Sequence, residues 1–134
     1  MNELVVFDTN VFVSYLLPPV GRLTAVKLVV KRVFDDKAIP VFSNEIMREY
    51  VNVLGRPKFH FPHDEVYELL GLVRYKGVCI DPLSTASHFS DASDKCFYDA
   101  ALTVGAWLVT GNVRHFPNAD FIVSPREYLE RTSG

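Results

Sequence analysis

The sequence predicts one α/β domain with a mostly parallel, buried central sheet. Short apolar segments of strand length alternate with segments of helical periodicity, which is the pattern of such a sheet. The 134 residues are 49% apolar and 22% charged, which is enough for one packed core. No repeat, linker or low-complexity tract divides the chain, so residues 1–134 are expected to form a single domain.

The first half of the chain predicts two strands and a helix. Leu4–Phe7 is a run of four apolar residues rich in β-branched side chains, which is typical of a buried strand. Val11–Leu17 is a second, almost equally apolar element. Apolar residues spaced three and four apart in Arg22–Asp36 predict an amphipathic helix, and Ile39–Phe42 predicts a short strand.

The middle of the chain predicts two helices and a third strand. Ser43 is a suitable N-cap for a helix at Asn44–Leu54, and Gly55 and Pro57 would end that helix. A helix is expected at Pro62–Tyr75 and a strand at Val78–Ile80.

The remaining segments complete the alternation of helices and strands. They are, in order, a loop at Asp81–Ser93, a helix from about Asp94 to Val104, a strand at Ala106–Thr110, a loop at Gly111–Asp120 and a strand at Phe121–Val123. Ser124 and Glu127 have the spacing of a capping box, with Pro125 in the first helical position, which predicts a short C-terminal helix.

Charge and cysteine content restrict the class of protein. The net charge of −2 and the pI near 6.0 argue against a protein that coats nucleic acid, although local basic residues could guide one strand into a compact site. Cys79 and Cys96 form no CxxC pair, which suits a reducing cytosol.

No basic leader precedes the first apolar run, Asp8–Asn10 interrupt it, and no apolar stretch reaches the roughly 18 residues of a membrane span. A soluble, cytoplasmic protein is therefore expected.

Four polar residues can meet at one edge of the predicted sheet. Asp8 follows the first strand and Asn112 follows the fourth, and ligands of open α/β sheets bind beyond the carboxyl ends of strands. Asp94 begins the helix that leads into the fourth strand, and Glu49 lies at the border of the apolar face of its helix.

Such a group of carboxylates predicts a divalent cation. Carboxylates a few ångströms apart repel one another unless a cation joins them. Hard oxygen ligands without His or Cys favour Mg²⁺ or Mn²⁺, which can promote phosphodiester hydrolysis. Thr9 and Asn10 would then arrange Asp8.

Each residue also has a structural explanation. Asp8 and Asp94 could be helix caps, Glu49 a solvated charge, and Asn112 a turn residue. Asp99 falls about 140° around the helix from Asp94, and is expected to lie outside the site. The histidines, which have no metal-ligand spacing on a clear helix, are expected on the surface or in loops: His60, His63, His88 and His115.

Four segments carry a resemblance to a known family. They are VVFDTNVFVS, EIMREYVNVL, DKCFYDAAL and WLVTGNVRHFP, and together they resemble a PIN domain, in particular the toxin-like ribonucleases of toxin–antitoxin pairs. The resemblance covers nearly the whole chain. It implies a three-layer α/β/α fold and a Mg²⁺- or Mn²⁺-dependent endoribonuclease, a hydrolase that cuts single-stranded RNA.

The resemblance also implies roles for individual residues. Asp8, Glu49 and Asp94 match the family's acidic metal ligands, and Thr9 and Thr110 match its supporting hydroxyls. Asn112 stands where family members commonly carry Asp, which removes one negative charge from the catalytic set. The family further implies a homodimer and a small antitoxin partner.

Two rival functions differ in what they require. A phosphatase of the haloacid-dehalogenase type also begins with a strand followed by Asp, but it needs a second Asp where this chain has Asn10. A degenerate domain that binds RNA or a protein without cleavage is supported by Asn112. Phosphate-binding GxxxxGK loops, a GxSxG nucleophile elbow and an HExxH helix are absent from the sequence.

Overall fold

The central sheet has five parallel strands in the order β3-β2-β1-β4-β5. A computed structural model describes residues 3–18, 24–85, 89 and 91–132. The strands are β1 (Glu3–Phe7), β2 (Ala38–Phe42), β3 (Val78–Cys79), β4 (Trp107–Val109) and β5 (Ile122–Val123). The expectation of a mostly parallel sheet is confirmed.

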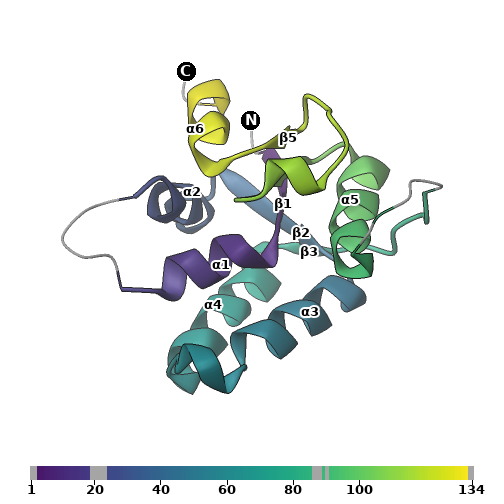
Figure 1. Ribbon diagram of the computed structural model, residues 1–134. Helices are drawn as coiled ribbons and strands as arrows, with labels where there is room; N and C mark the ends of the chain where they lie inside the picture. Colours follow the sequence, from purple (N-terminus) through teal and green to yellow (C-terminus); the bar gives the residue numbers. More distant parts are fainter. Residues whose placement is uncertain (1–2, 19–23, 86–88, 90, 133–134) are drawn as a thin grey trace.

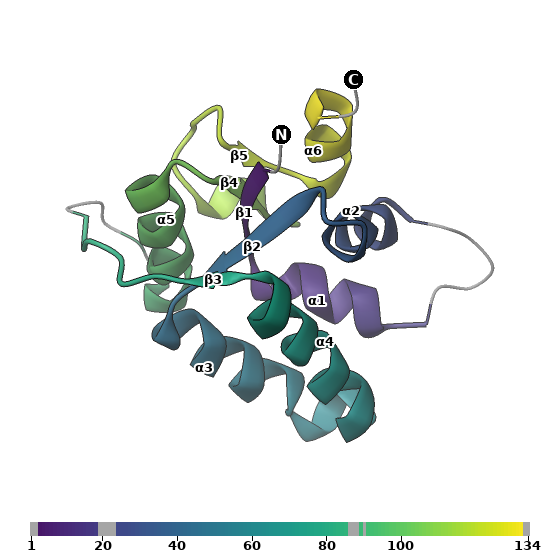
Figure 2. The same cartoon turned by 180° about the vertical axis from the view of Figure 1, so that it is seen from behind.

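Helices cover both faces of this sheet. They are α1 (Thr9–Leu16), α2 (Ala25–Phe34), α3 (Asn44–Leu54), α4 (His63–Lys76), α5 (Ala92–Val104) and α6 (Pro125–Thr132), with short 3₁₀ turns η1 (Pro57–Phe59) and η2 (Val113–His115). Figure 1 shows α5 on one side of the sheet and α2 with α6 on the other, and Figure 2 shows the same layers from behind. The arrangement fits the three-layer α/β/α fold implied by the resemblance.

The strand order places a topological switch point at β1. From β1 the chain moves outward through β2 and β3, and it then returns to add β4 and β5 on the other side of β1. In open parallel sheets, ligands bind beyond the carboxyl ends of the strands at such a point. The gap between the ends of β1 and β4 is therefore where a site is expected.

Burial on both faces of the sheet explains why β1 is a continuous apolar run. Val5, Val6 and Phe7 are at most 1% exposed, because helices cover β1 on both faces. Of the helices among the described residues, none is long and apolar enough to cross a membrane.

Several predicted boundaries need correction. The helix expected from about Asp94 begins at Ala92, with Asp91 as its N-cap, so the loop predicted to Ser93 ends earlier. The loop at Gly111–Asp120 contains the turn η2, and the element predicted at Val11 begins at Thr9. The helix predicted at Arg22–Asp36 spans Ala25–Phe34, with Thr24 as its N-cap, and Arg22 and Leu23 lie outside the described residues.

Candidate active site

Asp8 lies at the end of β1, at the switch point. It occupies the N-cap position of α1, yet its side chain makes no capping hydrogen bond. Its carboxylate instead accepts a hydrogen bond of 2.7 Å from the Thr110 hydroxyl, which follows β4. Burial raises the pKa of Asp8, and the Thr110 hydroxyl and the backbone N–H groups of Thr9 and Asn10 only partly counteract this effect. Because a carboxylate has about four acceptor positions, Asp8 keeps capacity to bind a cation in addition to these donors.

The loop after β4 is tied to Asp8 and to the start of α1. The Thr110 hydroxyl accepts a hydrogen bond from the Asn112 backbone N–H at 3.0 Å. The side-chain oxygen of Asn10 accepts one from the Gly111 N–H at 3.1 Å. These contacts hold together the two chain segments that follow β1 and β4.

Asp94 lies in the first turn of α5 and is affected by the other acidic residues. Its pKa is raised to about 6, first by burial and then by the negative charges of Asp8, Asp91 and Glu49. His115 of η2 lies 3.9 Å from the Asp94 carboxylate, measured from Nδ1 to Oδ2, and acts in the opposite direction. The negative charges of Asp8 and Glu49 therefore both act on Asp94 at this edge of the sheet.

These side chains do not form a complete metal site by themselves. Within the described ranges, no three His, Cys, Asp or Glu side chains come close enough together to hold a metal ion. Mg²⁺ in proteins is commonly held by one or two carboxylates and several waters, so Asp8 and Asp94 fit this cation without a third close ligand. The like charges that raise the pKa of Asp94 are also those that a cation would neutralise.

Thr9 and Asn112 lie near Asp8 in the chain fold, but neither side chain forms a hydrogen bond with another described residue of the site. The Thr9 hydroxyl is buried and has no hydrogen-bond partner among the described residues. The Asn112 side chain is exposed, and only its backbone N–H contacts Thr110.

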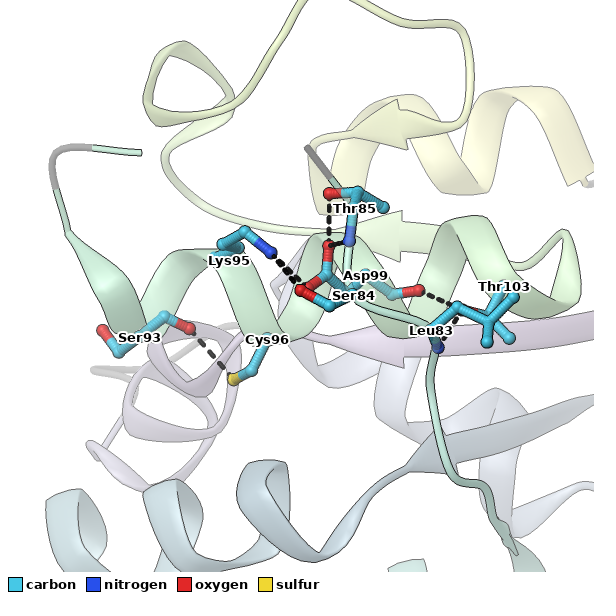
Figure 3. Close-up of polar contacts among 8 residues, drawn as sticks. All are labelled: Leu83, Ser84, Thr85, Ser93, Lys95, Cys96, Asp99 and Thr103. Carbon is cyan, nitrogen blue, oxygen red and sulfur yellow. Dashed lines mark hydrogen bonds and ion pairs between the residues drawn. The ribbon is translucent and has the colours of Figure 1, made fainter. Parts of the chain in front are cut away.

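Asp99 has a structural role. Figure 3 shows its carboxylate between Lys95, one turn earlier on α5, and Thr85 of the preceding loop. The Lys95 ammonium lies 2.8 Å from Asp99 and also donates to Ser84 at 3.1 Å. Asp99 is thus occupied in fastening residues 84–85 to α5, as expected from its position on the helix.

Tyr50 joins the elements that carry the acidic residues, and the sequence interpretation missed it. Its hydroxyl, fully buried, donates a hydrogen bond to the Phe7 carbonyl, next to Asp8. Its ring packs against Phe12 of α1 and Phe97 of α5, with centroid distances of 4.9 and 6.1 Å. The signal in the sequence was its place beside Glu49 on the apolar face of α3.

Comparison with known proteins agrees with the fold. Residues 4–114 match a protein-family model described as a PIN domain. No curated protein and no solved structure matches the chain. The matched stretch runs from within β1 to within η2, so it includes Asp8, Glu49, Asp94 and Asn112.

Proposed function

Because this chain belongs to the PIN-domain family, whose members generally have nuclease activity, we propose that it is a divalent-metal-dependent endoribonuclease acting on single-stranded RNA. The observation that carries this proposal is the Asp8 carboxylate. It lies at the N-cap position of α1, where its side chain makes no capping hydrogen bond. It is held at the switch point by the hydrogen bond from Thr110. Its negative charge, together with that of Glu49, acts on Asp94.

Asp8 and Asp94 are the residues that would hold Mg²⁺ or Mn²⁺, and Glu49 would add its negative charge at the same edge of the sheet. The bound cation would supply Lewis-acid stabilisation of the negative charge that develops on the phosphodiester during hydrolysis. Thr110 keeps Asp8 in place through its 2.7 Å hydrogen bond, and Asn10 fixes the Gly111 backbone beside it. Thr9 places a buried hydroxyl next to Asp8, with no hydrogen-bond partner among the described residues.

A nuclease assay tests the proposal. Mixed single-stranded RNAs incubated with Mn²⁺ should be cut by the wild-type protein, and Asp8→Asn and Asp94→Asn should lose nearly all of this activity. Asp99→Asn is the matched control on α5, because Asp99 contacts Lys95 and Thr85 and not the site. Circular dichroism at the assay temperature shows whether each variant is folded. Equal loss in Asp94→Asn and Asp99→Asn would contradict the assignment.

Asn112 supports a second candidate, a PIN-like domain that binds RNA or a protein without cleavage. A neutral amide at this position leaves the site with one charge fewer than a four-carboxylate set. Binding of single-stranded RNA by the wild-type protein, without any cleavage in Mg²⁺ or Mn²⁺, would favour this function over the nuclease.

The resemblance to toxin-like ribonucleases extends the proposal to a cellular role. We propose that the protein is the toxin of a toxin–antitoxin pair, acting in the cytoplasm as a homodimer and inhibited by a small antitoxin. An adjacent reading frame for a small DNA-binding protein, whose co-expression relieves growth inhibition, would support this role.

A further inference from the structure

We propose that the outer face of α4 binds a second copy of this chain, with the two α4 helices crossing at Gly71. This face is defined by the exposed residues Tyr67, Glu68, Gly71, Arg74 and Tyr75. The inference rests on the homodimer of the proposed function and adds the surface on which the two copies meet. It is independent of nuclease activity.

Gly71 is exposed in the middle of α4. Outside the backbone of its own helix, a Cβ atom added at this position would meet no atom of the described structure within 4 Å. Glycine destabilises a helix relative to alanine, so neither packing within the chain nor helix propensity accounts for it. A second helix that crosses α4 at Gly71 does account for it, because the missing side chain lets two backbones approach closely.

The residues around Gly71 form a mirror pattern in which only the charge is inverted. The segment 67–75 is YELLGLVRY, so apolar residues and tyrosines occur at equal distances before and after the glycine. Glu68 precedes Gly71 by three residues and Arg74 follows it by three, and neither forms an ion pair with a described residue. A two-fold axis at Gly71 can give each of them a partner of opposite charge on the second copy. This complementarity favours a second copy of the chain as the occupant.

Helix geometry determines how the two copies meet. At about 100° per residue, Glu68 and Arg74 lie about 60° to either side of Gly71, and the two tyrosines lie about 40° to either side in the opposite sense. The charged residues therefore mark one diagonal of this face, and the tyrosines mark the other. A two-fold axis along the tyrosine diagonal brings Glu68 of each copy to Arg74 of the other and places like tyrosines against each other. The helices then cross nearly at right angles.

The centre of this face is apolar and is bordered by two grooves. Tyr67 and Tyr75 are 80% and 87% exposed, the highest values among the exposed large hydrophobic side chains that the structure describes. Gly71 lines both grooves, one of about 440 Å³ against α1 and α2 and one of about 520 Å³ against α3. Figure 2 shows α4 between α1 and α3. Aromatic residues at the centre with charged residues at the rim are typical of a protein–protein interface.

Charge reversal tests the predicted pairing. Sedimentation velocity from about 1 to 200 μM should show a wild-type dimer, since small interfaces bind weakly. Glu68→Arg and Arg74→Glu should each weaken association by about tenfold, because like charges then face each other twice. An equimolar mixture of these two variants should recover the wild-type affinity as a heterodimer, since one face is then basic and the other acidic. Glu130→Arg, at an exposed position of α6, is the charge-matched control and should associate as the wild type does.

Gly71→Ala separates the interface from the stability of one chain. Alanine should raise the melting temperature of the dilute monomer by a few degrees, because it favours the helix and its methyl group meets nothing in the described chain. It should weaken association by about tenfold, because this methyl group lies where the two helices are closest. A lower melting temperature, or unchanged association, would contradict the proposed crossing.

The outcomes separate this interface from the proposed function. A wild-type protein that stays monomeric at all these concentrations overturns the interface. A dimer that both charge reversals and Gly71→Ala leave intact meets through another surface, which overturns the interface and leaves the homodimer and the nuclease standing. If the mixed variants fail to associate, the reciprocal pairing is wrong and the proposal falls with it. A wild-type dimer with recovery in the mixture, but without RNA cleavage, supports the interface and refutes the nuclease.

Discussion

The hydroxyl of Thr110 donates a 2.7 Å hydrogen bond to the carboxylate of Asp8, across 102 residues of sequence. Both groups are buried, Asp8 at 6% exposure and Thr110 at 0%. The same hydroxyl accepts from the Asn112 N–H, so one oxygen links the ends of β1 and β4 to the following loop. This contact fixes the position of the carboxylate on which the candidate site depends.

Replacing Thr110 by valine should destabilise the protein in a pH-dependent way. The ionised Asp8 carboxylate would lose a charge-assisted hydrogen bond, which costs about 2 kcal/mol at pH 7.5. The cost should shrink at pH 4.5, because Asp8 has a raised pKa and protonates as the pH falls. Urea denaturation at both pH values measures it, with Thr110→Ser as the control that keeps the donor. If the free energy of unfolding falls equally at both pH values, lost packing and not the hydrogen bond to Asp8 is the cause.

Divalent metal should stabilise the fold, because a cation relieves the repulsion acting on Asp94. At ten times the dissociation constant, mass action adds about 1.4 kcal/mol. The melting temperature should then rise by a few degrees, or about 2–8 °C per kcal/mol depending on size. Asp8→Asn should abolish the rise, whereas Asp64→Asn, an exposed residue of α4, should keep it. The shared-site interpretation fails if millimolar Mn²⁺ leaves melting unchanged in the wild-type protein.

Asp94→Asn should raise the melting temperature of the metal-free protein at pH 7.5. The pKa of Asp94 is about 6 when folded and near its ordinary value of 3.8 when unfolded. Ionised Asp94 therefore disfavours the folded state by an amount that grows as the pH rises from about 4 to 6 and stays constant above. Most of the gain should disappear at pH 4.5. Thermal melts in EDTA at the two pH values test this.

Asp91→Ala is the informative comparison, because its effect should have the opposite sign. The Ser93 hydroxyl and N–H lower the pKa of Asp91, so its ionised form stabilises the fold at pH 7.5. The variant should melt below the wild type. If both substitutions shift melting in the same direction, the electrostatic account of Asp94 is wrong.

Tyr50→Phe should weaken metal binding through the position of α3. Loss of the buried bond to the Phe7 carbonyl should cost about 1 kcal/mol of stability. It should also reduce the Mn²⁺-dependent rise in melting temperature. The lost bond no longer fixes the position of Glu49 relative to Asp8. Tyr128→Phe is the matched control, since the Tyr128 hydroxyl contacts Glu3 at the other end of β1. A similar metal response in the two variants would make Tyr50 a purely structural residue.

Asn112→Asp should tighten Mn²⁺ binding at neutral pH by about tenfold, or about 1.4 kcal/mol. One added charge near a cation attracts it by more than this, and repulsion from the other carboxylates and loss of hydration offset most of the gain. The gain should be smaller at pH 5.5, where the carboxylates begin to protonate. Calorimetric titration at both pH values measures it, with the exposed Asn118→Asp as control. Unchanged affinity would leave Asn112 as a turn residue.

Local sequence signals predicted the fold well. Ser43 caps the helix Asn44–Leu54 through a 3.1 Å bond to the Ile46 N–H, and both predicted helix ends agree with the structure. Ser124 and Glu127 form the expected capping box, with two reciprocal hydrogen bonds of 3.1 Å. These features involve residues three or four apart, so the sequence contains all the information that they need.

Long-range contacts of the site could not be predicted in the same way. The bond from Tyr50 to Phe7 spans 43 residues, and the proximity of His115 to Asp94 depends on how η2 folds back toward α5. The polar residues after β1 and β4 could be placed at one edge, because parallel strands bring their carboxyl ends together. Their individual hydrogen bonds, and the absence of a capping bond from Asp8, depend on packing that periodicity does not encode.

The order of strands in the sheet also has a consequence for synthesis. β1 lies at the centre of the sheet but is made first, and its neighbour β4 begins only at Trp107. At translation rates of about 5–20 residues per second, β4 follows β1 by roughly 5–20 s. During that interval one edge of β1 has no partner strand, and Asp8 has no Thr110 to hold it. The site is therefore assembled only after β4 and Thr110 have been made, so chains released by the ribosome before that point would lack it.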